Sequence, residues 1–349
     1  MDSSVTAALL LEQGYKVVGV YMKNWSQDLP GMICPWQEDY QDAKRVAVQL
    51  GVDFKMYDFE TEYRDRVVQY MIDEYQAGRT PNPDIMCNQE VKFKLFLDTA
   101  LADGADMIAT GHYARINNAE TGFEGQPQLL MGLDKNKDQA YFLYRVTQPA
   151  LGCSLFPLGG YEKPEVRKIA TRLGLVTAAK KDSQGICFVG KVGIRDFLSQ
   201  FVTTAPGSII DQHQRIIGTH EGAIFYTIGQ RHGLDVGGGL PYYVVGKSMI
   251  KNEVYVTTQL DDPRLWRKEM TLSALHWINN PPEPGHSYTI RTRYRASLIN
   301  CQLGKPSFDE ITGSQNITAV LQDEIRAITP GQSAVIYDNE RVVGGGIVV

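Results

Sequence analysis

The sequence predicts an α/β protein, with a doubly wound parallel sheet in its N-terminal part and β-rich architecture after it. Helical and strand patterns alternate through residues 1–110, which is typical of a parallel sheet with helices on both faces. From about residue 205 the segments become short strands separated by glycine and proline turns. From about residue 268 short alternating segments predict a β-barrel.

Each N-terminal element has its own local signal. Apolar residues at helical spacing predict a helix over Val5–Gln13 that ends at Gly14, and the β-branched stretch "KVVGVYM" predicts a buried strand. Ligands of such a sheet bind at the carboxyl ends of its strands. The next predicted elements are a helix at 38–50, a strand at 53–59, helices at 63–77 and 92–102, and a strand in "DMIATGHYA" that runs into a loop.

Later elements are shorter. We expect a hairpin near "NNAETGFEGQPQLL", an aromatic strand after the polar turn 137–139, and a helix in "EKPEVRKIATRLGL" with Pro164 in its first turn. The predicted strands beyond residue 205 include "GSIID", "PYYVVGKS", "EVYVTT", "SYTIRTRYRA", "ITAVLQD" and "SAVIYDNERVVGGGIVV".

Length and composition limit the classes of protein that are possible. The 349 residues are too many for one ordinary core, so we expect two or three domains. No apolar run is long enough to span a membrane, and no signal peptide is visible, which predicts a cytoplasmic protein with no membrane partner. The net charge of −5 means that a nucleic acid would be met by local basic patches.

The five cysteines are widely spaced and odd in number, which argues against a disulfide scaffold. The chain has no CxxC, so we expect no structural zinc site and no bound metal held by cysteines. Three of the cysteines are interpreted as structural, namely Cys34, Cys153 and Cys301.

The other two cysteines lie in polar, cationic surroundings. In "TPNPDIMCNQEVKF", Cys87 is expected just before a helix, where a thiol gains thiolate character, and Asp84 is a candidate general base. Pro81 and Pro83 predict a rigid extended loop here. In "KKDSQGICFVG", Cys187 follows turn residues and is flanked by lysines. Two such thiols suit a nucleophile and a partner that resolves or carries sulfur, although a small buried cysteine is the alternative for each.

Several polar residues fall where a ligand would bind. Asp2, Ser3 and Ser4 begin a helix and suit either the end of a phosphate loop or an ordinary N-cap. Gly111 and His112 follow a strand, where a glycine allows close approach of a ligand. The polar turn Lys137, Asp138 and Gln139 is by default a solvated turn.

Two segments are basic. Residues 161–195 carry a local charge of +5. In "SYTIRTRYRA", a continuous strand would place Arg291, Arg293 and Arg295 on one face, beside Tyr294. Such a row suits a phosphate backbone and a base, whereas an edge strand protected by charge is the alternative.

Taken together, these stretches resemble one family, the tRNA-specific 2-thiouridylases (tRNA-uridine 2-sulfurtransferases). The strings that carry the resemblance run in order over nearly the whole chain: "DSSV", "GYKVVGVYMKNW", "TPNPDIMCNQEVKF", "ATGHYAR", "KDQAYFLYR", "DSQGICFVG", "YTIGQRHGL", "RTRYR" and "TPGQSAVIYD". The resemblance implies an adenine nucleotide α-hydrolase-like domain of the pyrophosphate-loop type at 1–200, a small central domain at 201–267 and a C-terminal β-barrel at 268–349.

The resemblance also implies a reaction: ATP, with Mg²⁺, adenylates O2 of a tRNA wobble uridine, and sulfur replaces that oxygen. Cys187 would carry a persulfide received from a cysteine desulfurase or sulfur-relay protein, and Cys87 would end in a disulfide with it. The other implied roles are acid/base chemistry for Asp84; the base pocket for Asn82 and Pro83; nucleotide contacts for Asp2, Ser3, Ser4, Met22 and Gly111; and tRNA contacts for His112, Lys137, Asp138, Gln139, Arg293, Tyr294 and Gln332.

One departure from the family pattern concerns the start of the sequence. Family members begin with a strand and a Ser-Gly-Gly-x-Asp-Ser-Ser loop, whereas Met1 here stands at x. The first strand and part of the phosphate loop would therefore be missing, so weak ATP turnover is expected. A truncated or misassigned start is the favoured explanation, and a decayed relative that only binds tRNA is the alternative.

Overall fold

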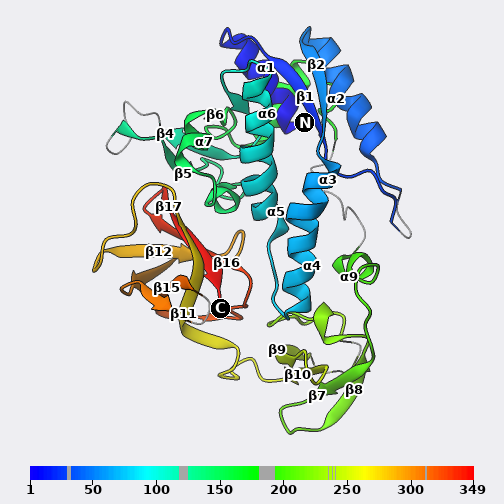
Figure 1. Ribbon diagram of the computed structural model, residues 1–349, viewed down its shortest axis with the longest axis vertical. Helices are drawn as coiled ribbons and strands as arrows, with labels where there is room; N and C mark the ends of the chain where they lie inside the picture. Colours follow the sequence, from blue (N-terminus) through cyan, green and yellow to red (C-terminus); the bar gives the residue numbers. More distant parts are fainter. Residues whose placement is uncertain are drawn as a thin grey trace.

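The computed structural model describes residues 1–29, 33–117, 125–180, 193–234, 236–237, 239, 241–310 and 313–349. The N-terminal α/β part, the small β-rich part and the barrel are spatially distinct in Figure 1, with the barrel beside the helices that link the other two. The predicted combination of an α/β domain, a central domain and a barrel is confirmed.

The N-terminal part contains two parallel strand pairs with helices around them. Strand β1 (Val18–Lys23) pairs with β2 (Asp53–Asp58), and β3 (Ile108–Ala109) pairs with β6 (Ser154–Leu155). The helical segments are α1 (Asp2–Glu12), α2 (Trp36–Leu50), α3 (Glu60–Tyr63), η1 (Arg64–Val68), α4 (Gln69–Gln76), α5 (Pro83–Met86), η2 (Cys87–Leu95), α6 (Phe96–Ala102), η4 (Ala140–Leu143), α7 (Gln148–Gly152), α8 (Lys163–Arg172) and α9 (Ile194–Leu198).

Two predictions in this part are wrong. The helix expected at 92–102 begins at Pro83, because Asn82 caps the first turn by accepting a hydrogen bond from the Ile85 N–H at 3.3 Å. Helical structure then continues from α5 through the π-helical η2 to α6, so Cys87 lies inside it. The aromatic strand expected after residue 139 is the 3₁₀ helix η4.

The C-terminal part is a closed barrel. Its strands follow the order β11, β15, β13, β12, β16 and β17, and the pairing of β11 with β17 closes it. A hairpin of the N-terminal part, β4 (Ala114–Asn117) and β5 (Gln128–Met131), extends this sheet at β17. The barrel strands are β11 (Trp266–Trp277), β12 (Ser287–Arg291), β13 (Ile299–Leu303), β14 (Ser307–Asp309), β15 (Ser314–Arg326), β16 (Ser333–Asp338) and β17 (Arg341–Val348).

The small central part is a sheet with the order β8, β7, β10 and β9. Its elements are β7 (Gly207–Ile210), β8 (Ile216–His220), η5 (Ala223–Phe225), β9 (Tyr243–Ser248) and β10 (Glu253–Thr257). All three parts meet at Thr80: its N–H donates to the Pro330 carbonyl at 2.8 Å, and its hydroxyl lies 3.2 Å from that of Thr227. Two left-handed glycines allow this contact, since a Cβ on Gly331 would lie 2.7 Å from the Thr80 nitrogen and one on Gly229 would lie 2.4 Å from Ala327.

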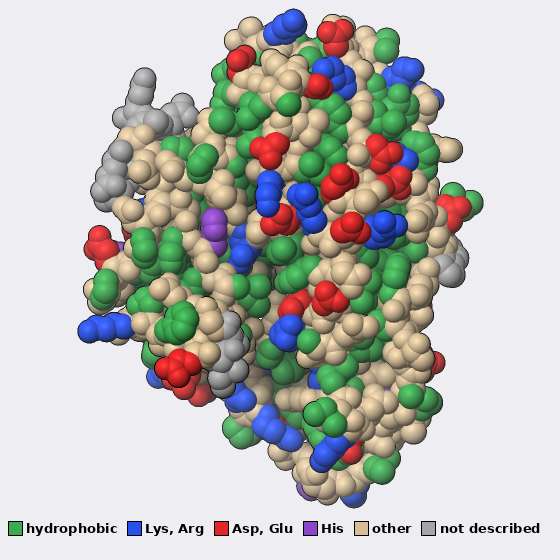
Figure 2. Space-filling view, in the orientation of Figure 1, with side chains coloured by type: hydrophobic (Ala, Val, Ile, Leu, Met, Phe, Trp, Pro, Cys, Tyr) green, Lys and Arg blue, Asp and Glu red, His purple; other side chains and the backbone are tan. Residues whose placement is uncertain are grey.

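The surface carries both signs of charge. On the face shown in Figure 2, basic and acidic side chains are interspersed, without a continuous field of one sign. Many are paired; for example, Lys180 binds Asp39 at 2.7 Å and Asp42 at 2.5 Å. Recognition of a polyanion on this face would therefore depend on a few positioned cations. Within the described ranges, no helix is both long and apolar enough to cross a membrane.

Candidate active site

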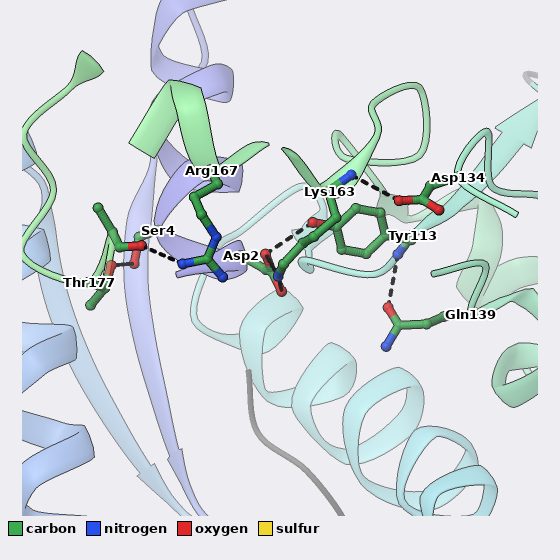
Figure 3. Close-up of polar contacts among 9 residues, drawn as sticks. Asp2, Ser4, Tyr113, Asp134, Gln139, Lys163, Arg167 and Thr177 are labelled. Carbon is green, nitrogen blue, oxygen red and sulfur yellow. Dashed lines mark hydrogen bonds and ion pairs between the residues drawn. The ribbon is translucent and has the colours of Figure 1, made fainter. Parts of the chain in front are cut away.

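The first cluster of the site surrounds the N-terminus of α1. Both carboxylate oxygens of Asp2 accept hydrogen bonds from the Lys163 ammonium at 2.8 Å, and Asp2 Oδ1 also accepts one from the Tyr113 hydroxyl at 3.1 Å (Figure 3). Ser3 is exposed, whereas Ser4 is buried and accepts a hydrogen bond from the Thr177 hydroxyl at 3.1 Å. The cluster therefore combines a helix N-terminus, hydroxyls and a nearly buried cation, which are the groups that bind phosphate.

Gly111 lies directly against this helix end. A Cβ at that position would lie 2.9 Å from both Asp2 Cβ and the Ser3 nitrogen, so only glycine allows the strand end to come this close. The predicted nucleotide residues Asp2, Ser3, Ser4 and Gly111 are thus brought together. Met22 lies at the carboxyl end of β1, in the other strand pair, and its nucleotide contact stays a prediction.

Lys163 is a residue of this cluster that sequence reasoning did not select. It was visible only as one of many basic residues in 161–195, although Pro164 marked the helix start that places it. Its side chain is 11% exposed and its ammonium also lies 5.6 Å from the centre of the Tyr113 ring. Lysine at this depth is costly unless a partner anion is near, and the phosphates of a nucleotide would be such an anion.

Removing this cation is expected to weaken nucleotide binding. Lys163→Met should raise the KM for ATP roughly tenfold or more, because a charge-assisted hydrogen bond is lost and Asp2 is left to repel phosphate. The measurement is initial-rate kinetics at saturating tRNA. Lys168→Met, on the exposed face of α8, is the matched control and should leave the KM unchanged. An unchanged KM in both variants would remove Lys163 from the site.

The second cluster lies along α5 and η2. Asp84, Cys87 and Lys92 follow one another along this helical stretch, and Cys87 is 2% exposed. Burial raises the pKa of the Asp84 carboxyl above its usual value, and the charge of Lys92 opposes this. A π-helical turn at this point is typical of functional segments.

His112 joins the second cluster. Burial lowers its pKa well below the usual value, and the charge of Lys92 acts in the same direction. Its Nδ1 lies 2.7 Å from the Thr110 hydroxyl, and its ring lies against those of Phe93 and Phe156 at centroid distances of 5.7 and 5.9 Å. His112 is therefore a neutral imidazole at physiological pH, so any contact with tRNA would be a hydrogen bond and not an ion pair.

Tyr113 connects the first cluster to the turn 137–139. Its backbone N–H donates to Gln139 Oε1 at 3.0 Å, while its hydroxyl holds Asp2 (Figure 3). The side chain of Asp138 is fully buried: it accepts from the N–H groups of Gly132 and Ala140 and binds Arg291 of the barrel at 3.1 Å. Its predicted tRNA contact stays a prediction, but the structure gives this carboxylate a partner inside the protein.

The third cluster lies where the barrel meets the base-pocket loop. Arg293 donates to Gln332 Oε1 at 3.0 Å and to the Ala327 carbonyl at 2.7 Å. Tyr141 lies between this cluster and Asn82: burial raises its pKa, a hydrogen bond with Asn82 and the charge of Arg293 oppose this, and its hydroxyl donates to the Ser333 carbonyl at 2.9 Å. Pro83 is buried at the start of α5. Asn82, Arg293 and Gln332 are thus joined through one tyrosine.

The row of three arginines on one strand face is wrong. Strand β12 ends at Arg291, and residues 292–295 form bends and turns. Arg291 therefore turns inward to Asp138, Arg293 points to the loop at 327–332, and Arg295 is exposed. Tyr294 lies against Phe142 with ring centroids 4.7 Å apart.

The remaining cysteines do not form a pair in the part of the chain that the structure describes. Cys34, Cys87, Cys153 and Cys301 are free thiols there. Cys187 lies outside the described residues, so its distance from Cys87 is a prediction only. The described residues also contain no cluster of three or more His, Cys, Asp and Glu side chains that could hold a metal ion.

The fold and these clusters are those of a tRNA-modifying protein with a nucleotide-binding domain and two β-rich modules. Family models match in that order: the tRNA methyl transferase HUP domain at residues 1–191, the tRNA methyl transferase PRC-barrel domain at 195–258 and the aminomethyltransferase beta-barrel domain at 267–348. The predicted boundaries at 200/201 and 267/268 stay predictions.

Curated relatives give the family more narrowly. The chain is 46% identical to the tRNA-specific 2-thiouridylase MnmA of Neisseria meningitidis, over 352 residues that cover 100% of this chain and 92% of the relative. It is 43% identical to that of Bacillus subtilis, with 100% and 92% covered, and 45% identical to that of Bordetella pertussis, with 100% and 95% covered. The chain belongs to the tRNA-specific 2-thiouridylase family.

Proposed function

We propose that this chain catalyses the ATP-dependent 2-thiolation of the wobble uridine of tRNA. The observation that carries the proposal is the position of Tyr113, which binds Asp2 of the phosphate cluster and Gln139 of the predicted tRNA turn. His112 and Gly111 precede it, so nucleotide, target base and tRNA backbone would meet within a few residues of one strand end. Family membership supports the same substrate.

ATP fits the first cluster. The backbone N–H groups of the first turn of α1 have no carbonyl partner within the helix, Ser3 is exposed, and Gly111 leaves the space that a Cβ would fill. ATP would supply the adenylyl group that turns O2 of the uridine into a leaving group. Mg²⁺ would be held mainly by phosphate oxygens and water, with Asp2 as the nearest carboxylate, because Mg²⁺ does not require an all-protein site.

The sulfur step uses both thiols. A persulfide on Cys187, supplied by a cysteine desulfurase or a sulfur-relay protein, attacks C2 through its terminal sulfur, and AMP leaves. The Cys87 thiolate then attacks Sγ of Cys187, which breaks the persulfide S–S bond, leaves the sulfur on the uridine and forms a Cys87–Cys187 disulfide. A thiol reductant must return two electrons before the next cycle.

Asp84 is suited to acid/base chemistry at the base, and this role predicts a stability signature. Its folded-state pKa is raised above the unfolded value of 3.8, so the ionised carboxylate destabilises the fold above the folded-state pKa, and this penalty disappears below the unfolded value. Asp84→Asn should therefore increase the Tm at about pH 7.5, with little effect at about pH 3.5, while lowering thiolation roughly 100-fold.

Thermal unfolding at both pH values and nucleoside analysis test this prediction. Asp98→Asn, at an exposed position on α6, is the control and should change neither the Tm nor the activity. A Tm gain that is equal at both pH values, or an Asp84→Asn variant with full activity, would contradict the acid/base role.

A non-catalytic tRNA-binding relative is the second candidate. The observation in its favour is that the parallel strands form two separate pairs, β1–β2 and β3–β6, and that no Ser-Gly-Gly stretch precedes Asp2 in this sequence. We propose that ATP turnover by this chain is weak, and that a strand with Ser-Gly-Gly placed before Met1 would join β1 to β3 and raise it.

One experiment separates the candidates. Unmodified tRNA is incubated with ATP, Mg²⁺ and a sulfide source, with either this chain or the same chain extended by a strand and Ser-Gly-Gly, and its nucleosides are analysed by mass spectrometry. 2-Thiouridine only with the extended chain, or far more of it, is the expected result. Equal product from both would contradict the role of the added loop. Product from neither, although both bind tRNA, would favour the non-catalytic candidate.

A further inference from the structure

The turn after β12 holds one arginine in an unusual backbone conformation. Arg295 has a φ of 63°, in the left-handed region. Among the described non-glycine residues with such a φ, it is the one that carries a charge. This conformation costs a bulky residue about 1–3 kcal/mol and persists only where the surroundings hold it.

Contacts from both domains hold the Arg295 side chain. Its Nε donates to the Asn136 carbonyl of the N-terminal domain at 2.9 Å, and its guanidinium lies 5.2 Å from the centre of the Tyr294 ring in the barrel. The side chain is nevertheless exposed. Its two terminal nitrogens make no hydrogen bond or ion pair with any residue that the structure describes. The guanidinium is thus oriented by its Nε and its face, while the two-nitrogen edge that binds oxyanions is left available.

This position lies between two segments for which tRNA contacts are proposed. Asn136 directly precedes Lys137, and Tyr294 directly precedes Arg295. The same junction is fixed by the Asp138–Arg291 ion pair at 3.1 Å and by the contact of Phe142 with Tyr294. A polyanion that contacts both segments would pass Arg295.

We propose that Arg295 binds a backbone phosphate of the tRNA through its two terminal nitrogens. The inference rests on the proposed function, since it takes tRNA as the substrate, and adds a contact to it. A phosphate accepts a bidentate hydrogen bond from a guanidinium edge, and a lysine would lack both this fork and the stacking on Tyr294. The contact carries no sequence information, so it would act equally on every tRNA substrate.

Arg295→Asn tests the proposal without loss of the fold. Asparagine tolerates the left-handed region better than arginine, so the variant should unfold at the same temperature or higher. Its Kd for unmodified tRNA should rise roughly tenfold. The slope of log Kd against log salt should fall by about 0.7 to 0.9, the loss expected for one phosphate contact. Arg295→Lys should recover part of the affinity.

The control is Arg267→Asn, an exposed arginine near the start of β11, which should leave Kd and salt slope unchanged. The kcat at saturating tRNA should stay constant in Arg295→Asn, with the effect confined to the KM for tRNA. An unchanged Kd and salt slope in Arg295→Asn would overturn the proposal. So would a fall in kcat at unchanged Kd.

The same measurements separate this proposal from the proposed function. If the parent chain binds tRNA but forms no 2-thiouridine even when extended, while Arg295→Asn still shows the weaker binding and smaller salt slope, thiolation fails and the phosphate contact stands. If the extended chain thiolates tRNA and Arg295→Asn matches the parent in Kd, the contact alone fails. Failure of the parent chain to bind tRNA would overturn both.

Discussion

Replacing Cys87 with serine is expected to lower 2-thiouridine formation by the extended chain by roughly 100-fold or more, the scale on which a positioned catalytic group acts. A hydroxyl in this place cannot attack the Cys187 sulfur as a thiolate does, so the sulfur transferred to the uridine would stay bound to the protein. The measurement is nucleoside mass spectrometry over a time course. A second readout is tRNA that remains covalently attached and is released by a thiol reductant.

The structure supplies a matched control for this variant. Cys87 and Cys301 are 2% and 3% exposed, and both belong to apolar cores. Cysteine-to-serine replacement at either position buries a hydroxyl and should lower the free energy of unfolding by about 1–3 kcal/mol. If Cys87 is only a small buried side chain, both variants lose stability and keep their activity. If it is the second thiol, activity is lost in Cys87→Ser alone.

The burial of Cys87 also predicts how the reaction must proceed. A thiol that is 2% exposed cannot reach a sulfur on another segment without a local rearrangement. Alkylation of Cys87 by a small thiol reagent should therefore be slow in the free protein and faster with tRNA bound, because the substrate would open the α5–η2 region. Equal rates with and without tRNA would contradict a substrate-induced opening.

Local sequence signals predicted most of the fold, and their failures have local causes. The helix that ends at Gly14, the helix that ends at Gly51 and the strands around Gly19 and Phe54 lie where expected, because a glycine stop and β-branched runs are strong signals. The helix from Pro83 was missed because two prolines predicted an extended loop. Asn-Pro-Asp is also an N-cap followed by proline in the first turn, and this signal wins.

The long-range contacts of the site could not be predicted from the sequence. Nothing in "KDQAYFLYR" shows that Asp138 is fully buried against Arg291, because the pair is 153 positions apart and depends on the docking of the barrel. The aromatic run is helical because Tyr141 and Tyr144 bind Ser333 of the barrel. The alternation of arginines likewise predicts a continuous strand, and the strand ends where Arg291 turns inward to Asp138.

Removing the carboxylate of Asp138 is expected to be the most destabilising single change among those considered. In the folded state it accepts two backbone N–H bonds, at 2.9 and 3.1 Å, besides the ion pair with Arg291, whose side chain is 9% exposed. Asp138→Ala leaves a buried guanidinium without its anion, a change that typically costs 3–5 kcal/mol, so we expect a loss of about that size. Urea unfolding with a constant m-value measures it.

The control is Asp338→Ala, which breaks a pair with Arg341 whose side chains are 25% and 26% exposed. Because solvent screens that pair, the loss should be at most about 1 kcal/mol. Replacing both partners in Asp138→Leu/Arg291→Met should recover much of the stability, since two apolar side chains leave no buried charge. A double variant as unstable as Asp138→Ala would mean that the two backbone hydrogen bonds, and not the ion pair, dominate.

The same variants decide between two roles for Asp138. If its side chain contacts tRNA, Asp138→Asn should weaken tRNA binding while changing the free energy of unfolding little. If the ion pair with Arg291 is its role, Asp138→Asn should lose stability because the anion is gone, while the Kd for tRNA stays close to that of the parent wherever the variant is folded. The buried position favours the second outcome, because a fully buried carboxylate beside a phosphate backbone would add repulsion and offer no contact. The turn 137–139 would then bind tRNA through its neighbours, with Asp138 fixing the domain contact that holds Asn136 and Arg295 together.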